Sequence, residues 1–335
     1  MLKSIVAGLL LMLVPTASAQ VRQIDTERAL ATLGFTPDEV AQARGGQPVA
    51  KLLASDGPTD IGAFGVIKIP AQTDRLVFWL KDISAFRKAA ELGVARRLST
   101  PPAVGDFADL SVDAKDLDAI RGCRPGRCDL RLGDTAIQRF QTGVNWSAPD
   151  AGARANQVMR QLLLELAQAY LKGGDAQLGV VHNEKAPRAA ADEFHQVLWK
   201  SKTLYNVAPP FAAYLEGFPT AQLPNSEQFL YWAKNAFGSD ASMSLHQMVI
   251  YNAPSGAVMI ADKLLYASRY TDAGLVVISM ASSADKSGFY ALIGARASSS
   301  QLGGVGARLL RRTVERGTTD TVKMYLEWMR ASLTQ

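Results

Sequence analysis

The clearest strand pattern of apolar residues lies in the C-terminal third of the chain. Four segments there are rich in β-branched and aromatic side chains, and turn-forming residues bound each of them: 242–251, 258–270, 273–280 and 288–296. Such segments, joined by short turns, are typical of consecutive strands. The pattern therefore predicts an antiparallel sheet.

The rest of the chain carries mainly helical patterns. Apolar residues recur at helical spacing over 151–171, and further helices are predicted at 25–33, 37–44, 84–92, 189–200, 210–216 and 227–237. A strand is predicted at 61–69, and the helix after it takes Thr73 as its N-cap. A brief strand is also predicted at 128–132.

A long helical tail follows Gly304, with an interruption predicted at Gly317. Beyond the interruption one stripe of the helix is apolar, and it consists of Val322, Tyr325, Leu326, Met329 and Leu333. Such a stripe has to be buried, and the preceding sheet is the nearest apolar surface. We therefore expect the tail to lie against the sheet.

The N-terminus has the order of a cleavable signal peptide. Lys3 supplies a positive charge, 5–14 is apolar, and 17–19 reads Ala-Ser-Ala, which suits signal peptidase. The apolar run is shorter than the roughly 20 residues that span a bilayer, although an uncleaved anchor is the alternative. We expect residues 1–19 to be removed and the protein to be periplasmic or secreted, with no transmembrane segment in the mature chain.

Charge and cysteine content narrow the picture further. Removal of Lys3 leaves a net charge of about +4, and the charges are scattered, which argues against nucleic acid as a partner. Cys123 and Cys128 flank a Pro-Gly turn that folds the chain back on itself, so an oxidising compartment favours a disulfide between them. A catalytic or metal-binding role for the pair is the alternative, but the spacing differs from Cys-x-x-Cys.

These elements predict an α+β fold, in which an antiparallel sheet is combined with a long C-terminal helix and a helical insertion. We expect a signal peptide at 1–19, an N-terminal helical cap at 20–59, and an α+β domain at 60–335. The insertion, at about 93–241, is expected to be mainly helical.

Two parts of the chain resemble START/Bet v1-like helix-grip domains in the order of their elements. One is the strand, proline and helices around 65–71 (GVIKIPA) and 76–83 (LVFWLKDI), and the other is the strands and long helix of 242–333. The resemblance implies a curved sheet that grips the C-terminal helix around an apolar cavity for lipids, steroids or similar molecules. It implies no catalytic residue, and an unrelated α+β fold is the alternative.

Sequence motifs for metal or nucleotide chemistry are missing. The three histidines show no His-Glu-x-x-His pattern, and no Rossmann fingerprint or Gly-x-Ser-x-Gly elbow occurs. Ser283 and Lys286 match the spacing of Ser-x-x-Lys, but they lie in a polar turn between predicted strands. That motif requires its serine at the start of a helix. We therefore expect no metal and no cofactor.

Candidate ligand-binding residues lie on the predicted C-terminal sheet, and they are His246, Tyr266, Arg269, Tyr270 and Arg296. Strand alternation puts the two tyrosines on one face with Ile260 and Leu264. Polar groups among apolar neighbours need a partner, in the protein or in a ligand, and the arginines would suit an anionic head group. Core residues that are satisfied within the protein are the alternative.

The sequence thus predicts an exported, non-enzymatic protein that binds a hydrophobic or amphiphilic small molecule, such as a lipid, in an α+β cavity. One alternative is a hydrolase or cyclase that uses His246 in the same cavity, which a carboxylate within hydrogen-bond reach of His246 would favour. The other is a structural or interaction protein of the envelope.

Overall fold

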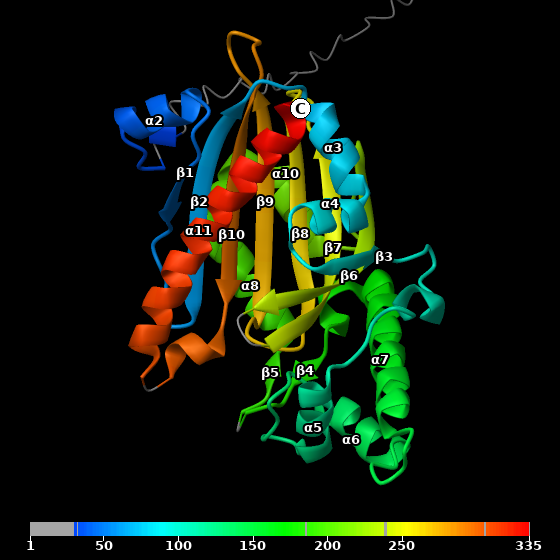
Figure 1. The fold of residues 1–335 in the computed structure, drawn as a ribbon. Coiled ribbons are helices and arrows are strands. Elements are labelled where there is room, and N and C mark those ends of the chain that lie inside the picture. The colour runs from blue at the N-terminus through cyan, green and yellow to red at the C-terminus, as the bar shows by residue number, and fades with distance from the viewer. Residues whose placement is uncertain (1–29, 32, 185, 238–239, 305, 335) are drawn as a thin grey trace, which may run out of the picture.

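An eight-stranded antiparallel sheet forms the centre of the protein (Figure 1). The computed structural model describes residues 30–334 apart from 32, 185, 238, 239 and 305, so the expected signal peptide and most of the expected helix 25–33 lie outside the described residues. The strand order is β1-β2-β10-β9-β8-β7-β6-β3. The strands are β1 (Val49–Leu52), β2 (Asp60–Ile69), β3 (Val94–Arg97), β6 (Ser226–Phe237), β7 (Asp240–Asn252), β8 (Val258–Ala267), β9 (Ala273–Ser282) and β10 (Phe289–Ser298).

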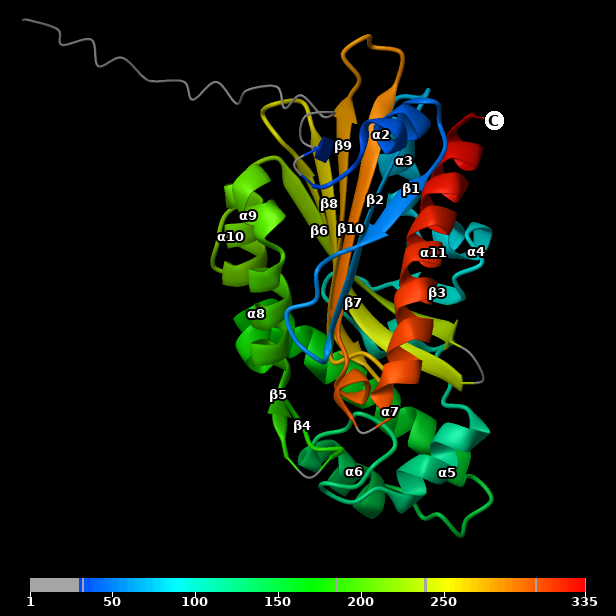
Figure 2. The same ribbon diagram turned by 90° about the vertical axis from the view of Figure 1, so that its left-hand side faces the viewer.

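Helices cover both faces of this sheet (Figure 2). The face that carries α11, α3 and α4 is called the inner face below, and the opposite face, which carries α7 to α10, is called the outer face. The helices are α2 (Pro37–Arg44), α3 (Thr73–Lys81), α4 (Ile83–Ala89), α5 (Ala114–Gly122), α6 (Asp134–Gly143), α7 (Ala151–Gly173), α8 (Ala190–Lys200), α9 (Lys202–Val207), α10 (Pro209–Gly217) and α11 (Ala307–Thr334). The predicted α+β fold is therefore confirmed, with a long C-terminal helix gripped against the sheet.

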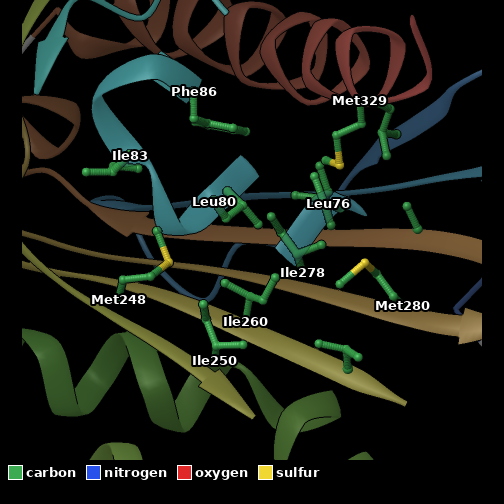
Figure 3. Packing of buried hydrophobic residues seen from close by; sticks show 14 of the residues in the cluster. Leu76, Leu80, Ile83, Phe86, Met248, Ile250, Ile260, Ile278, Met280 and Met329 are labelled. Carbon is green, nitrogen blue, oxygen red and sulfur yellow. The ribbon is translucent and has the colours of Figure 1, made fainter. Parts of the chain in front are cut away.

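The main core lies between the inner face and the three helices on it. Leu80 and Phe86 from α3 and α4 point toward Ile260 and Ile278 of the sheet (Figure 3). From α11 the core receives Val322, Leu326, Met329 and Leu333, as the apolar stripe predicts. Burial of apolar surface on this scale is the dominant stabilising contribution to such a fold.

Helix α11 packs tightly against the sheet at Gly65 of β2. A Cβ atom added there would clash with Cγ1 of Val322 and would lie 3.0 Å from Cδ1 of Leu326 and 3.1 Å from the carbonyl oxygen of Val49. A residue with no side chain thus lets the helix pack directly on the strand.

Several predicted elements are wrong in detail. Residues 227–237, expected to be helical, form strand β6, because Phe229 and Tyr231 face the inner core while Leu230 and Trp232 face the outer one. A strand buried on both faces reads as a continuous apolar run without alternation. Residues 128–132 form no strand.

Helix boundaries also differ from those predicted. Helix α11 continues through Gly317, since the packing of its apolar stripe outweighs the roughly 1 kcal/mol that a helical glycine costs. Thr73 is the first residue of α3 rather than its cap, because Gln72 occupies the N-cap position without a side-chain hydrogen bond.

The segments expected as cap and insertion both contribute to the sheet. The range 20–59 supplies edge strand β1 in addition to α2, and the range 93–241 supplies β3 and β6 as well as its helices. The turn between Cys123 and Cys128 brings their Cα atoms to 4.4 Å, and the structure joins them in a disulfide.

Candidate functional site

Two adjoining cavities lie between the inner face and its helices. The smaller, of about 100 Å³, is bounded by α3, α4, α11 and the strands β6 to β10. The larger, of about 250 Å³, lies beside the N-terminal half of α11, where Thr318 forms part of its wall. Both have Asp262, Val276 and Ala295 in their walls. Because they share these three residues, the two adjoining cavities are together called the groove below.

The groove is mainly apolar, and several polar groups are added in the wall of its larger cavity. Apolar side chains such as Phe86, Met248 and Ile278 surround the smaller cavity. Asn235 and Ser242 contribute an amide and a hydroxyl to the wall of the larger one. This combination matches an amphiphilic molecule, because ligand sites combine an apolar lining with a few polar groups that fix orientation.

A chain of hydrogen bonds lies where the two cavities meet. His246 Nδ1 is 2.9 Å from Asp262 Oδ1, and His246 Nε2 is 2.8 Å from Ser244 Oγ. The Tyr231 hydroxyl donates to Asp262 Oδ2 at 2.6 Å, and its ring stacks on the His246 imidazole at 4.6 Å between centroids. The carboxylate at Nδ1 assigns a proton to Nδ1, so a neutral His246 leaves Nε2 to accept from Ser244. The Ser244 hydroxyl has a second, longer acceptor in the carbonyl oxygen of Ala233 at 3.3 Å.

Strand geometry accounts for this grouping. Ser244 and His246 are two residues apart on β7, so both point to the inner face. Asp262 on β8 pairs with Met248 and is therefore the diagonal neighbour of His246 across the two strands. Tyr231 on β6 lies directly opposite His246 on its other side. Three adjacent strands thus position four polar side chains without any loop.

The electrostatics keep Asp262 ionised. Burial alone would raise the pKa of Asp262, but the charge of His246, the hydrogen bonds from His246 and Tyr231, and the charge of Arg87 together lower it. Burial and the nearby carboxylate of Asp262 raise the pKa of Tyr231 well above its ordinary value. Tyr231 therefore remains a hydrogen-bond donor, and Asp262 an acceptor.

Four of the five predicted ligand-binding residues line the larger cavity, and they are His246, Arg269, Tyr270 and Arg296. Their charges and hydroxyls already have partners in the protein. Arg269 Nε donates to Asp116 at 2.9 Å, Arg296 Nη1 donates to Asp60 at 2.6 Å, and the Tyr270 hydroxyl donates to Asp240 at 3.0 Å. Because both arginines are neutralised by carboxylates, the expected attraction of an anionic head group is not supported.

Tyr266 faces away from the groove, contrary to our expectation. A β-bulge shifts the register of β7 and β8 between Leu245 and His246, so Leu265 and Tyr266 both face the outer side. One extra residue in a strand makes all the side chains beyond it point to the opposite face of the sheet. The Tyr266 hydroxyl is buried there without a hydrogen-bond partner among the described residues.

Ser244, Asp262 and Asn235 were missed in the sequence. Pro254 and Gly256 mark the turn between β7 and β8 in the sequence, and counting pairs outward from that turn places Asp262 opposite Met248, beside His246. No comparable signal identified Asn235, because its segment was taken for a helix.

The remaining histidines lie apart from the groove. His182 Nδ1 contacts Asp134 at 2.8 Å, and His195 Nδ1 contacts Glu216 at 3.3 Å. Within the described part of the chain, no group of three or more potential ligands could hold a metal ion. Nor does any described helix have the length and apolarity needed to cross a membrane.

Comparison with known proteins gives little guidance. No protein-family model matches the chain, and no curated protein is detectably similar to it. Among solved structures, the chain is similar to the STAR-related lipid transfer protein (fragment 25–204) from Xanthomonas axonopodis, with a TM-score of 0.40 and 9% identity over 86% of this chain and 94% of that one. A TM-score this low carries neither the family nor its activity to this chain, so the fold rests on the sheet and helices described above.

Proposed function

We propose that this chain is an exported protein that binds a hydrophobic or amphiphilic small molecule in the groove. The observation that carries the proposal is the pair of adjoining cavities under α11, both lined mainly by apolar side chains and with several polar groups in the wall of the larger one. Neither cavity alone reaches the roughly 300 Å³ of a small ligand site, but together they do. A compact molecule with one chain or ring system therefore fits better than a two-chain lipid.

The groove favours an uncharged polar head. Arg269 and Arg296 are bound to carboxylates, and Asp262 is bound to His246 and Tyr231. Asn235 and Ser242 add uncharged polar groups to the same wall. A carboxylate or phosphate head bound by Arg269 or Arg296 would have to displace an internal ion pair, which costs more than it gains.

Export is proposed from the N-terminal sequence together with the cysteine pair. The order of charge, apolar run and Ala-Ser-Ala at 1–19 is that of a signal peptide. The Cys123–Cys128 bond is supportive, since disulfides persist mainly in oxidising compartments. Sequencing the N-terminus of the periplasmic protein tests this, and a chain that still begins at Met1 would refute it.

Binding is tested with the neutral fluorescent probe N-phenyl-1-naphthylamine. Ala295 is in the wall of both cavities, so Ala295→Leu should fill the groove and weaken probe binding by about tenfold or more. Ala331→Leu, on the exposed side of α11, is the matched control and should bind like wild type. Failure of wild type to bind, or equal binding by Ala295→Leu, would refute the proposal.

A further inference from the structure

Ser244, His246 and Asp262 are linked as a nucleophile, a base and an orienting carboxylate. The two bonds, 2.8 Å from Ser244 Oγ to His246 Nε2 and 2.9 Å from His246 Nδ1 to Asp262 Oδ1, have the connectivity of a serine hydrolase triad. All three side chains are part of the wall of the larger cavity. Since such triads are recognised by geometry and not by order in the sequence, the missing Gly-x-Ser-x-Gly motif does not exclude one.

We infer that the groove hydrolyses a neutral carboxylic ester of its hydrophobic ligand, with Ser244 as the nucleophile. The inference rests on the proposed binding function, because the ester must first occupy the groove. The smaller cavity would hold the acyl chain, and the wall of the larger one, whose charged groups are paired within the protein, would accommodate the ester group. A charged substrate is disfavoured for the same reason as a charged ligand.

The proposed hydrolysis uses only the ester, water and these three side chains. Ser244 Oγ attacks the ester carbonyl carbon while its proton passes to His246 Nε2, and His246 then gives that proton to the departing alkoxide as the C–O bond breaks. Water attacks the acyl-serine in the same way, with its proton passing through His246 back to Ser244. Asp262 keeps the Nδ1 proton in place and stabilises the transient imidazolium.

Asn235 is placed to stabilise the oxyanion. Its neighbour two residues earlier, Ala233, pairs directly with Ser244, so Asn235 is a diagonal neighbour of the nucleophile. Arg87 Nη2 donates to Asn235 Oδ1, which fixes the orientation of the amide. Among the described residues no acceptor takes its Nδ2 hydrogens, and these are available to a developing negative charge in the cavity.

Hydrolysis of p-nitrophenyl hexanoate by the full mature protein is the direct test. Ser244→Ala and His246→Gln should each lower kcat by at least about 100-fold, while N-phenyl-1-naphthylamine still binds. His195→Gln is the matched control, since His195 is an exposed histidine paired with Glu216, and it should keep full activity. Asp262→Asn, a positioning variant, should lower kcat strongly and change KM by less than about threefold.

A second measurement uses wild type alone, so it does not depend on whether the variants fold. Wild type should be labelled by a fluorophosphonate, and peptide mapping should place the label on Ser244. Probe binding without hydrolysis or labelling would overturn this inference and leave the binding function intact. Loss of probe binding in wild type would instead refute the binding function. Equal hydrolysis by Ser244→Ala and wild type would also overturn the inference.

Discussion

Two neighbouring charged residues of strand β8 have opposite surroundings, because they point to opposite faces of the sheet. On β8, Asp262 points to the inner face and Lys263 to the outer one. The Asp262 side chain keeps 24% of its surface exposed, toward the groove, whereas the Lys263 side chain is fully buried. Lys263 is enclosed by the carboxylate of Asp175, the carbonyl oxygen of Leu215 at 3.3 Å and the ring of Phe194 at 3.8 Å.

That difference separates a structural charge from one that is available for chemistry. The partners of Lys263 named above all come from the protein, and neither cavity of the groove has Lys263 in its wall. Asp262 instead belongs to a hydrogen-bonded chain that ends at Ser244 in a cavity wall. Burial of a charge therefore indicates function only when the group also borders open volume.

The largest effect should come from removing the carboxylate that partners Lys263. Asp175→Asn leaves a fully buried lysine without its counterion, so the free energy of unfolding near pH 6 should fall by about 3–4 kcal/mol. Asp262→Asn, on the inner face, should cost only about 1 kcal/mol. Urea unfolding near pH 6 measures both, and equal losses would remove the distinction between the faces.

The cost of Asp175→Asn should also depend on pH. Burial lowers the folded-state pKa of Lys263 from 10.5 to about 8, so between these values the unfolded chain holds a proton that the folded protein has released, and this group makes stability rise with pH. In Asp175→Asn the folded-state pKa of Lys263 falls further, so the rise of stability with pH begins at a lower pH. The stability gap between wild type and variant should therefore be larger near pH 6 than near pH 8, and a constant gap would contradict this.

A moderate effect is expected where α11 meets the sheet. Gly65→Ala should destabilise the protein by about 1–3 kcal/mol, because the new methyl group clashes with Val322. The double variant Gly65→Ala, Val322→Ala removes the clashing methyl and should recover part of that loss. Thermal or urea unfolding of the three variants completes the cycle, and strictly additive losses would mean that this contact does not determine the position of α11.

The smallest effect is expected at Tyr266. Since its buried hydroxyl has no partner among the described residues, Tyr266→Phe should leave the free energy of unfolding unchanged or raise it by up to about 1 kcal/mol. Probe binding in the groove should not change, because the residue faces the outer side. Weaker probe binding by this variant would place Tyr266 on the inner face after all.

Much of the fold could be predicted from local pattern alone. Strands β7 to β10 could be predicted because each is rich in β-branched and aromatic residues and is bounded by turn-forming residues. Helix α7 could be predicted because its buried residues recur at helical spacing. Strand β6 could not be distinguished from a helix, since Phe229, Leu230, Tyr231 and Trp232 are all buried, on alternating faces. A contiguous apolar run of this length is compatible with either structure.

The candidate site was only partly predictable, because it depends on register. His246 was identified from its apolar neighbours, but its partner Asp262 requires the pairing of β7 with β8. Tyr266 was placed on the wrong face because nothing local in the sequence marks the bulge beside it. Strand alternation predicts which face of the sheet a side chain points to only within an uninterrupted strand, and the prediction fails beyond the first bulge.

The strand order also constrains when the protein can fold during synthesis. β2 pairs along its whole length with β10, and about 220 residues separate the paired Ile69 and Phe289. At typical translation rates the early strand waits on the order of 10 to 45 seconds for its partner to be made. The hairpin of β1 and β2 is at best marginally stable alone, so the growing chain stays open through most of its synthesis. Such a chain remains accessible to chaperones that bind unfolded proteins until its final strand and helix emerge. Until then it can also still be threaded through a narrow pore.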